Sequence, residues 1–341
     1  MENPYSIAKN ILQSPTEKIE DTDLPGRFTS IDLYGTSVNE KCAENGICNR
    51  FHLKNESGVG NITLYNVFPG IELVYNDMHM AYCNKHQKTA PCVVEINYCK
   101  EGRCECLFGK NRYCYMSAGN LSFCSLQDNS HQSEFPTSHY HGITVTLDFS
   151  MITKEMNNIL ELLNINLAHI KMLSEIQDFT IIRANSTVEH IFSELYTVPT
   201  EIRQGYIRVK VLELLLILTQ WNPQKDNLNC TNFSKIHIEC IKSIHKFLVS
   251  HFNEHYTINY LSEHFGISPT VMKKCFKGVY GDSIYAYMKL YRLRTAEQLL
   301  KETDLTIGEI ATQVGYTNPN KFTSAFHSKY KVTPTEYRKR V

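Results

Sequence analysis

The sequence predicts an α+β fold in which a strand-rich region comes first and an all-helical region comes last. Apolar residues recur with a period near two before Phe149, and with a helical period near 3.6 after Ser150. The chain has 341 residues, of which 42% are hydrophobic, which is long for one domain and enough to build more than one core. We therefore expect at least two domains.

Short runs rich in β-branched and aromatic residues predict strands from Ile62 to Phe149. Clusters of Gly, Pro, Asn or Lys separate these runs, a pattern typical of a small barrel or sandwich. Residues 1–58 are predicted to be irregular. The strand-like runs are ITLYNVF, IELVY, CVVEINYC, RCECLF, RYCYM and GITVTLDF.

Helices are expected near residues 151–167, 187–195 and 200–221, with Thr187 as the N-cap of the second. The third is apolar over much of its circumference, so it must pack on more than one side, against the barrel or a second subunit. The predicted organisation is a strand-rich domain over 1–150, a helical segment over 151–223, a linker over 224–235 and a helical domain over 236–341.

The helical domain opens with a pattern typical of a helix-turn-helix motif. Thr257 can cap a helix that ends at Gly266, where a left-handed backbone costs glycine little. Ser268 can cap the next helix, and Pro269 takes its first position, where a missing N–H is tolerated. The outward side of this second helix carries Thr270, Lys273, Lys274 and Lys277.

The same pattern returns further along the chain. Thr306 is a predicted N-cap with Glu309 as its capping-box partner. Gly315 makes the turn, and Asn318 and Pro319 begin the next helix. The outward side of that helix carries Asn320, Lys321 and Ser324.

A long helix, from about Ser283 to Lys301, joins the two motifs. Two motifs joined in this way place their second helices about one duplex turn apart, so one chain could read adjacent segments of the major groove. Charge supports this, because residues 236–341 hold 15 Lys/Arg against 9 Asp/Glu, a net charge of +6, and the remainder has −6.

The segment RLRTAEQLLKETDLTIGEIATQVGYTNPNKFTSAFHSKYKVTPTEYRK resembles the signature of the AraC/XylS family of transcription regulators, and the resemblance covers about Ile236 to Arg340. It implies a sequence-specific regulator that binds double-stranded DNA, usually an activator, often a homodimer, with RNA polymerase as a partner. In this family the base-reading side chains come early in each recognition helix. By position these are Thr270, Lys273, Lys274, Asn320, Lys321 and Ser324.

Pro319 departs from the family pattern, because it stands where a polar side chain could have contacted a base. Phosphate contacts are expected from Lys277 and Lys321, and also from Lys329 and Arg338. The first motif is therefore expected to supply more of the affinity for DNA than the second.

The resemblance also implies that residues 1–150 form a cupin-like β-barrel that senses a small-molecule effector, and that the helices after it form a dimerisation segment. A barrel of this size can enclose one small ligand. The side chains predicted to line the ligand site are Tyr75, His79, Glu95, Tyr98, Glu105, His139 and His141.

The cysteines and histidines leave open an alternative, a redox- or metal-responsive regulator. Nine of the twelve cysteines lie between Cys42 and Cys124, and reduced thiols are expected because no export signal is present. His139 and His141 share a strand face, and with Glu134 or a cysteine they could hold zinc or iron. Hydrogen-bonded histidines are the favoured interpretation, so neither a metal ligand nor a cofactor is assigned.

Motifs of enzymes are absent from the sequence, which contains no HExxH, GxSxG or P-loop. No catalytic residue is assigned, and we expect a protein that is not an enzyme. No apolar run reaches the roughly 18–20 residues that a spanning helix needs. A cytoplasmic protein without a membrane partner is expected.

Overall fold

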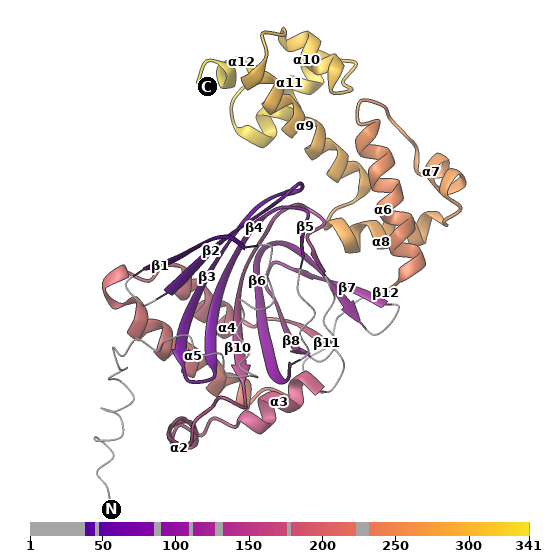
Figure 1. Cartoon of the computed structure of the whole chain (residues 1–341). Helices are drawn as coiled ribbons and strands as arrows, with labels where there is room; N and C mark the ends of the chain where they lie inside the picture. The colour runs from indigo at the N-terminus through magenta and orange to yellow at the C-terminus, as the bar shows by residue number, and fades with distance from the viewer. Residues whose placement is uncertain are drawn as a thin grey trace, which may run out of the picture. The chain divides into compact units, whose positions relative to one another are not determined.

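The computed structural model (Figure 1) describes residues 38–44, 48–84, 90–108, 112–126, 132–175, 179–222 and 232–340. The chain divides into two compact units, one rich in β-sheet and one helical from Asn232 onward. The predicted α+β class, with strands first and an all-helical C-terminal region, is confirmed.

The sheet-rich unit is built around one antiparallel sheet, in which hydrogen-bonded neighbours follow the order β1-β2-β3-β4-β10-β6. Strand β6 also pairs with β8, which pairs with β11, and β5 and β9 form a separate ribbon. Among the described strands no pairing closes this path into a ring, so the predicted closed barrel is not confirmed. The strands are β1 (Val38–Glu44), β2 (Cys48–Asn55), β3 (Gly58–Phe68), β4 (Ile71–His79), β5 (Tyr82–Asn84), β6 (Ala90–Phe108), β7 (Arg112–Ser117), β8 (Asn120–Leu126), β9 (Gln132–Glu134), β10 (Tyr140–Asp148) and β11 (Phe179–Arg183).

Two strand predictions were wrong. Residues 1–58 were expected to be irregular, yet β1 and β2 lie there, and Phe51 and Leu53 on β2 are buried on one face. The runs CVVEINYC and RCECLF belong to the single strand β6, in which Lys100 is an extra residue between the partners of His141 and Gly142. Such a bulge keeps a strand paired while changing which residues face the core.

Helices α2 (Lys154–Leu162), α3 (Leu167–Glu175), α4 (Ser186–Tyr196) and α5 (Arg203–Thr219) follow the sheet, with a 3-10 turn at Thr200–Ile202. The helix expected over 151–167 is split, because Asn164 takes a left-handed conformation with φ +56°. The N-cap of α4 is Asn185 and not Thr187, since the Asn185 side chain accepts the Val188 N–H.

Apolar side chains from the sheet and from α2 to α5 form the larger core of this unit. Tyr98 stacks on Phe192 of α4 with ring centroids 4.2 Å apart. Helix α5 buries one side in this core but leaves Val209 and Leu216 exposed. The alternate side chains of the same strands, among them Leu64, contribute to a second apolar cluster.

The helical unit contains α6 (Lys235–Ser250), α7 (Ile258–Phe265), α8 (Pro269–Tyr280), α9 (Ile284–Glu302), α10 (Ile307–Gln313), α11 (Pro319–Tyr330) and α12 (Pro334–Arg338), after the short strand β12 (Phe233–Ser234). Residues 223–231, which hold most of the predicted linker, lie outside the described residues. No helix in the described part of the chain is both long enough and apolar enough to cross a bilayer.

Candidate nucleic-acid interface

The first helix-turn-helix motif consists of α7 and α8, and its predicted capping residues are confirmed. Thr257 accepts the Tyr260 N–H, and Gly266 ends α7 with φ +65°. Ser268 accepts the Val271 N–H, with Pro269 in the first turn of α8. Each cap satisfies backbone groups that a short helix would otherwise leave unpaired, so both ends of the turn are fixed.

His245 of α6 holds the far end of α8 in place. Its ring stacks on Tyr280 with centroids 4.3 Å apart, and Nε2 lies 2.8 Å from the hydroxyl oxygen of Tyr287 on α9. Burial lowers the pKa of His245 to about 4, so the ring is neutral at physiological pH. This contact ties three helices together behind the outward face of α8.

The second motif, α10 and α11, repeats this construction. Thr306 and Glu309 form the predicted capping box, and Asn318 accepts the N–H groups of Asn320 and Lys321. Phe322 and Phe326 anchor α11 in an apolar cluster shared with α9 and α10. The observed α9 also matches the joining helix expected from about Ser283 to Lys301.

Arg292, a buried residue of α9, connects the two motifs. Its Nε and Nη2 donate to the carbonyl oxygens of Phe252 and Glu254, at 2.6 and 2.7 Å. Its Nη1 lies 3.4 Å from Nδ1 of His255, whose Nε2 donates to the Gly315 carbonyl at 2.9 Å. The loop before the first motif is therefore held against the turn of the second.

Gly315 is required at that turn for two reasons. Its φ of +82° is unfavourable for other residues, and a Cβ there would collide with the backbone of Asn253. The glycine that the sequence places in a turn thus also permits the loop after α6 to pack closely.

Glu297 of α9 fastens the last two helices. Its carboxylate accepts hydrogen bonds from Tyr330 of α11 at 2.8 Å and Tyr337 of α12 at 2.5 Å, and it pairs with Lys301 at 2.8 Å. Partial burial would raise the pKa of Glu297, but the hydrogen bonds from Lys301, Tyr337 and Tyr330 lower it to about 2.

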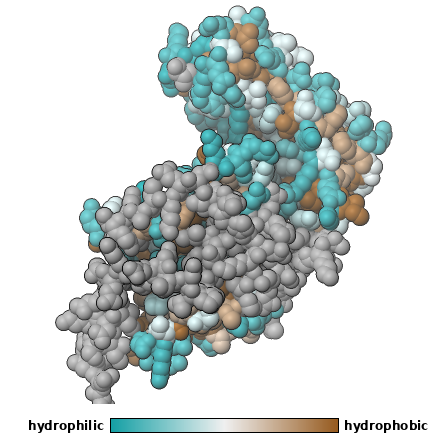
Figure 2. Space-filling model, in the orientation of Figure 1, coloured by the Kyte–Doolittle hydropathy of each residue, from teal (hydrophilic) through white to brown (hydrophobic). Residues whose placement is uncertain are grey.

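The side chains predicted to contact DNA are all exposed, on α8 and on α11. Among the described residues, no carboxylate is within ion-pair distance of the four lysines in this set, so each ammonium group is available to a phosphate. The visible face of the helical unit is largely hydrophilic (Figure 2). The set comprises Thr270, Lys273, Lys274, Lys277, Asn320, Lys321 and Ser324.

The seven side chains predicted to line a ligand site do not converge. Tyr75 and Tyr98 belong to the core shared with the helices, where the Tyr75 hydroxyl donates to the Leu195 carbonyl at 2.8 Å. Glu95 is buried beside Cys124, and Glu105 accepts the Tyr115 hydroxyl at 2.5 Å.

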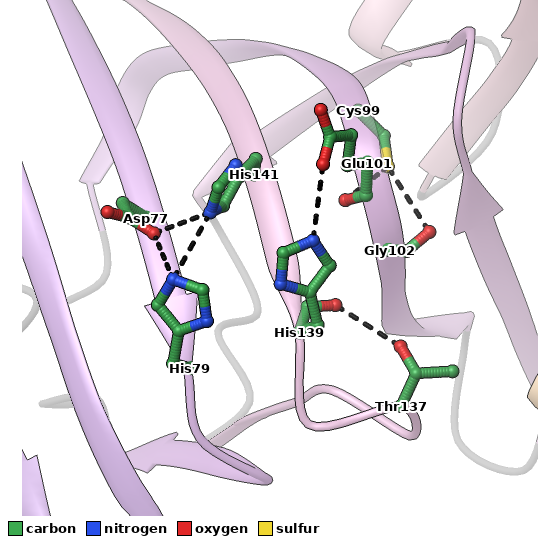
Figure 3. A network of polar contacts seen from close by, with 8 residues as sticks. All are labelled: Asp77, His79, Cys99, Glu101, Gly102, Thr137, His139 and His141. Carbon is green, nitrogen blue, oxygen red and sulfur yellow. Dashed lines mark hydrogen bonds and ion pairs between the residues drawn. The ribbon is translucent and has the colours of Figure 1, made fainter. Parts of the chain in front are cut away.

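The structure does bring His79, His139 and His141 together, each offering a ligand atom within 4.8 Å of the others (Figure 3). Glu134, considered as a partner of the histidine pair, is instead on β9 opposite Tyr82.

A further set of polar side chains was missed. Asn76 Nδ2 donates to Thr144 Oγ1 at 3.0 Å, and Thr144 donates to Asn97 Oδ1 at 2.8 Å, which forms a polar row across β4, β10 and β6. Asn76 and Thr144 are buried, like the nearby Glu95. The sequence did contain a signal for these residues, because a polar residue at alternate positions of an otherwise apolar strand is unusual. The predicted ligand site was restricted to aromatic and ionisable side chains and therefore did not include them.

Residues 261–340 match a family model described as a helix-turn-helix domain. The chain is 30% identical over 129 residues to the HTH-type transcriptional regulator ExsA of Pseudomonas aeruginosa, which is 37% of this chain and 45% of that protein. It is 26% identical over 161 residues to the HTH-type transcriptional activator RhaR of Mannheimia succiniciproducens, which is 47% of this chain and 56% of that protein.

Among solved structures, the C-terminal domain of AraT, a response regulator from Geobacillus stearothermophilus, is similar. It has 28% identity and a TM-score of 0.29, with 30% of this chain and 85% of that one covered. The chain thus spans about half the length of the curated relatives it matches.

The geometry and the match to the family model together define the helical unit as a helix-turn-helix DNA-binding domain. This unit is of the AraC/XylS type, as the sequence predicted for residues 236–340.

Replacing Arg292 by Met should lower the free energy of unfolding of the helical unit by about 3 kcal/mol, because the carbonyls of Phe252 and Glu254 lose their buried donor. Denaturant titration of the full chain, followed by the helical circular dichroism signal, measures this loss. The control is Arg294→Met, an exposed arginine of the same helix, which should change stability by less than about 0.5 kcal/mol. Equal effects of the two substitutions would contradict the role of Arg292.

Glu297→Gln should remove a pH-dependent stabilisation. Because the pKa of Glu297 is lower in the folded chain, its contribution is complete above the unfolded value of about 4.3. That contribution is lost as pH falls through the folded value of about 2. Unfolding curves at a series of pH values should show a wild-type advantage that is largest at neutral pH and shrinks in acid. Glu302→Gln, on an exposed residue of the same helix, is the control, and a variant as stable as wild type at neutral pH would refute this.

Proposed function

We propose that the chain is a sequence-specific transcription regulator that reads DNA with α8 and α11, and that its sheet-rich unit controls this activity by binding a small ligand. The observation that carries the proposal is the pair of capped motifs with exposed polar faces, joined by the 19-residue α9. At 1.5 Å per residue α9 is about 28 Å long, close to one duplex turn of about 34 Å. The proposal includes activation through RNA polymerase and a cytoplasmic location with the DNA.

The two faces differ in charge. Three exposed lysines lie on the outward side of α8, whereas Lys321 stands beside Asn320 and Ser324 on α11. Pro319 occupies the first turn of α11, and it offers no polar side chain to a base. We infer that α8 supplies more of the affinity, because it carries three exposed lysines, among them Lys277 for a phosphate contact. Phosphate contacts are also proposed for Lys321 and Lys329 of α11 and for Arg338 of α12.

Lys273→Ala should weaken binding about tenfold, equivalent to 1.4 kcal/mol, and Asn320→Ala should weaken it less. Fluorescence anisotropy at fixed salt, with a duplex that the wild-type protein selects from a random pool, measures both. Lys171→Ala, which removes an exposed lysine of the sheet-rich unit, is the charge-matched control. A larger effect of Asn320→Ala would overturn the asymmetry, and failure to select any duplex would overturn the function.

We propose that the small ligand binds at the polar row of Asn76, Thr144 and Asn97. Most buried polar side-chain atoms have at least one hydrogen-bond partner. Within the described part of the chain, Asn76 Oδ1 is buried and has no hydrogen-bond donor. A small effector with hydroxyl or amine groups would supply one, and Glu95 lies close enough along β6 to take part.

The alternative function of a redox-responsive regulator, which the cysteines left open, receives less support. Cys99 and Cys106 are buried, and burial raises the pKa of Cys99 to about 12. The pKa of Cys106 is raised as well. A hydrogen bond with Cys104 lowers this pKa, but a hydrogen bond with Cys114 and burial of the thiol raise it by more. A thiol with a raised pKa forms little of the reactive thiolate, so these cysteines act as apolar core residues.

Thr144→Val should abolish effector binding, because it removes the hydroxyl at the centre of the polar row. Native mass spectrometry of the full chain, purified from its own host, should show a released small molecule with wild-type protein and none with the variant. Thr63→Val, on the neighbouring strand β3, is the matched control. A ligand retained by the Thr144 variant would place the effector elsewhere.

A homodimer is proposed from the outer side of α5. Val209 and Leu216 on α5, and Ile202 in the 3-10 turn just before it, are exposed at a spacing of seven residues. They lie next to a side of α5 that is buried in the sheet-rich core. A seven-residue apolar repeat is the spacing with which two helices pack along a common seam. A second copy of α5 would cover this stripe, and a dimer would present four recognition helices to DNA.

A further inference from the structure

Five side chains capable of binding or orienting a metal ion lie at one end of the central strands of the sheet-rich unit (Figure 3). Asp77 of β4 and Glu101 of β6 are both register partners of His141 on β10, so these three residues form one row across the sheet. His79 lies two residues from Asp77 on β4, and His139 lies just before β10, two residues from His141. Tyr140 pairs with Met78 between the two rows. Side chains two apart on a strand share a face, so the register of β4, β10 and β6 assembles His79, Asp77, His141 and Glu101. His139 joins them from the residue before β10, with its ring centroid 4.5 Å from that of His141.

Three atoms of this group lie at hydrogen-bond and ion-pair distances from one another, so a small outward movement would let them surround one ion. Asp77 Oδ1 lies 2.9 Å from His79 Nε2 and 2.6 Å from His141 Nε2, and the two Nε2 atoms are 3.5 Å apart. Tetrahedral ligands about 2.0–2.1 Å from a zinc ion are about 3.3 Å from one another. Asp77 Oδ1 is buried and accepts no hydrogen bond of good geometry within the described residues, and the two Nε2 atoms lie within hydrogen-bond distance of each other. An ion would accept lone pairs from both nitrogens and from this oxygen, and so would satisfy all three.

His139 completes the set and has a partner that orients it. Its Nε2 lies 3.4 Å from Glu101 Oε2, and its second ring nitrogen is on the side facing His79 and His141 (Figure 3). A carboxylate on the far nitrogen of a metal-binding histidine fixes its tautomer and raises its basicity. Gly102, at φ +81°, allows this arrangement, because a Cβ there would collide with the His139 carbonyl oxygen.

We propose that His79, His139, His141 and Asp77 bind a divalent transition-metal ion of the zinc type, with Glu101 positioning His139. Imidazole and carboxylate ligands suit zinc and its first-row neighbours. The side chains are partly accessible, from 27% for His141 to 53% for Glu101, so an ion can enter from solvent and keep a water ligand. No cysteine belongs to this set, which separates the site from the thiol-rich part of β6.

Cobalt(II) is the probe that tests this site, because its visible spectrum reports the ligand type. The full chain, freed of metal with a chelator, should bind one equivalent with a spectrum of nitrogen and oxygen ligands and no thiolate charge-transfer band. Zinc should displace it. His79→Ala and His141→Ala should lose this equivalent, and Glu101→Gln should weaken it about 10–100-fold without changing the stoichiometry.

His190→Ala is the matched control, because His190 is a surface histidine 3.5 Å from the carboxylate of Glu194. It should bind cobalt like wild type. The isosteric Asp77→Asn variant tests the same site if an alanine variant unfolds. Binding unchanged in the cluster variants, a first equivalent ligated by sulfur, or no bound equivalent in wild type would each overturn the proposal. Since the measurement does not involve DNA, its failure would leave the proposed regulator function intact.

Discussion

The arrangement of the two DNA-reading motifs depends on the buried guanidinium of Arg292. It donates hydrogen bonds to the carbonyl oxygens of Phe252 and Glu254. It also contacts His255, which in turn donates to the carbonyl of Gly315 in the turn of the second motif. Burial lowers the pKa of Arg292, yet arginine stays charged at neutral pH, so one buried charge organises a loop that has no regular structure. A short apolar side chain at this position would leave the carbonyls of Phe252 and Glu254 without these donors, which would weaken the hold of this loop on the turn of the second motif.

The helical unit was predicted nearly residue by residue, because its determinants are local. Thr257, Ser268, Thr306 and Asn318 each act on backbone groups two or three residues away, and such signals are visible in a sequence. Arg292 was not identified, since its partners lie about forty residues earlier in the chain. The same holds for contacts of α9 with α11 and α12, which need the folded helices before they exist.

The sheet-rich unit was predicted less well, and the reason lies in its two buried faces. An alternating pattern identifies the inner face only when the other face is wet. Here Tyr98 belongs to the core shared with the helices, whereas Cys99, the next residue, belongs to the second cluster, so residues from both faces entered one predicted ligand site. His139 and His141 were expected on one strand, but His139 precedes β10, although the two rings lie with centroids 4.5 Å apart. His79 joins them only through the register of β4 with β10.

That register has a mechanical consequence. Asn76 and Asp77 are neighbours on β4, and one takes part in the polar row while the other takes part in the histidine cluster on the opposite face. On β10, likewise, Thr144 takes part in the polar row and His141 takes part in the histidine cluster on the opposite face. A shift of β4 against β10 that improves the contacts of an effector with the row therefore also changes the distance from Asp77 to His141. If both sites are occupied, each ligand must alter the affinity for the other by the same factor, because such coupling is reciprocal. The sheet would then combine two chemical signals before either reaches the DNA-binding domain.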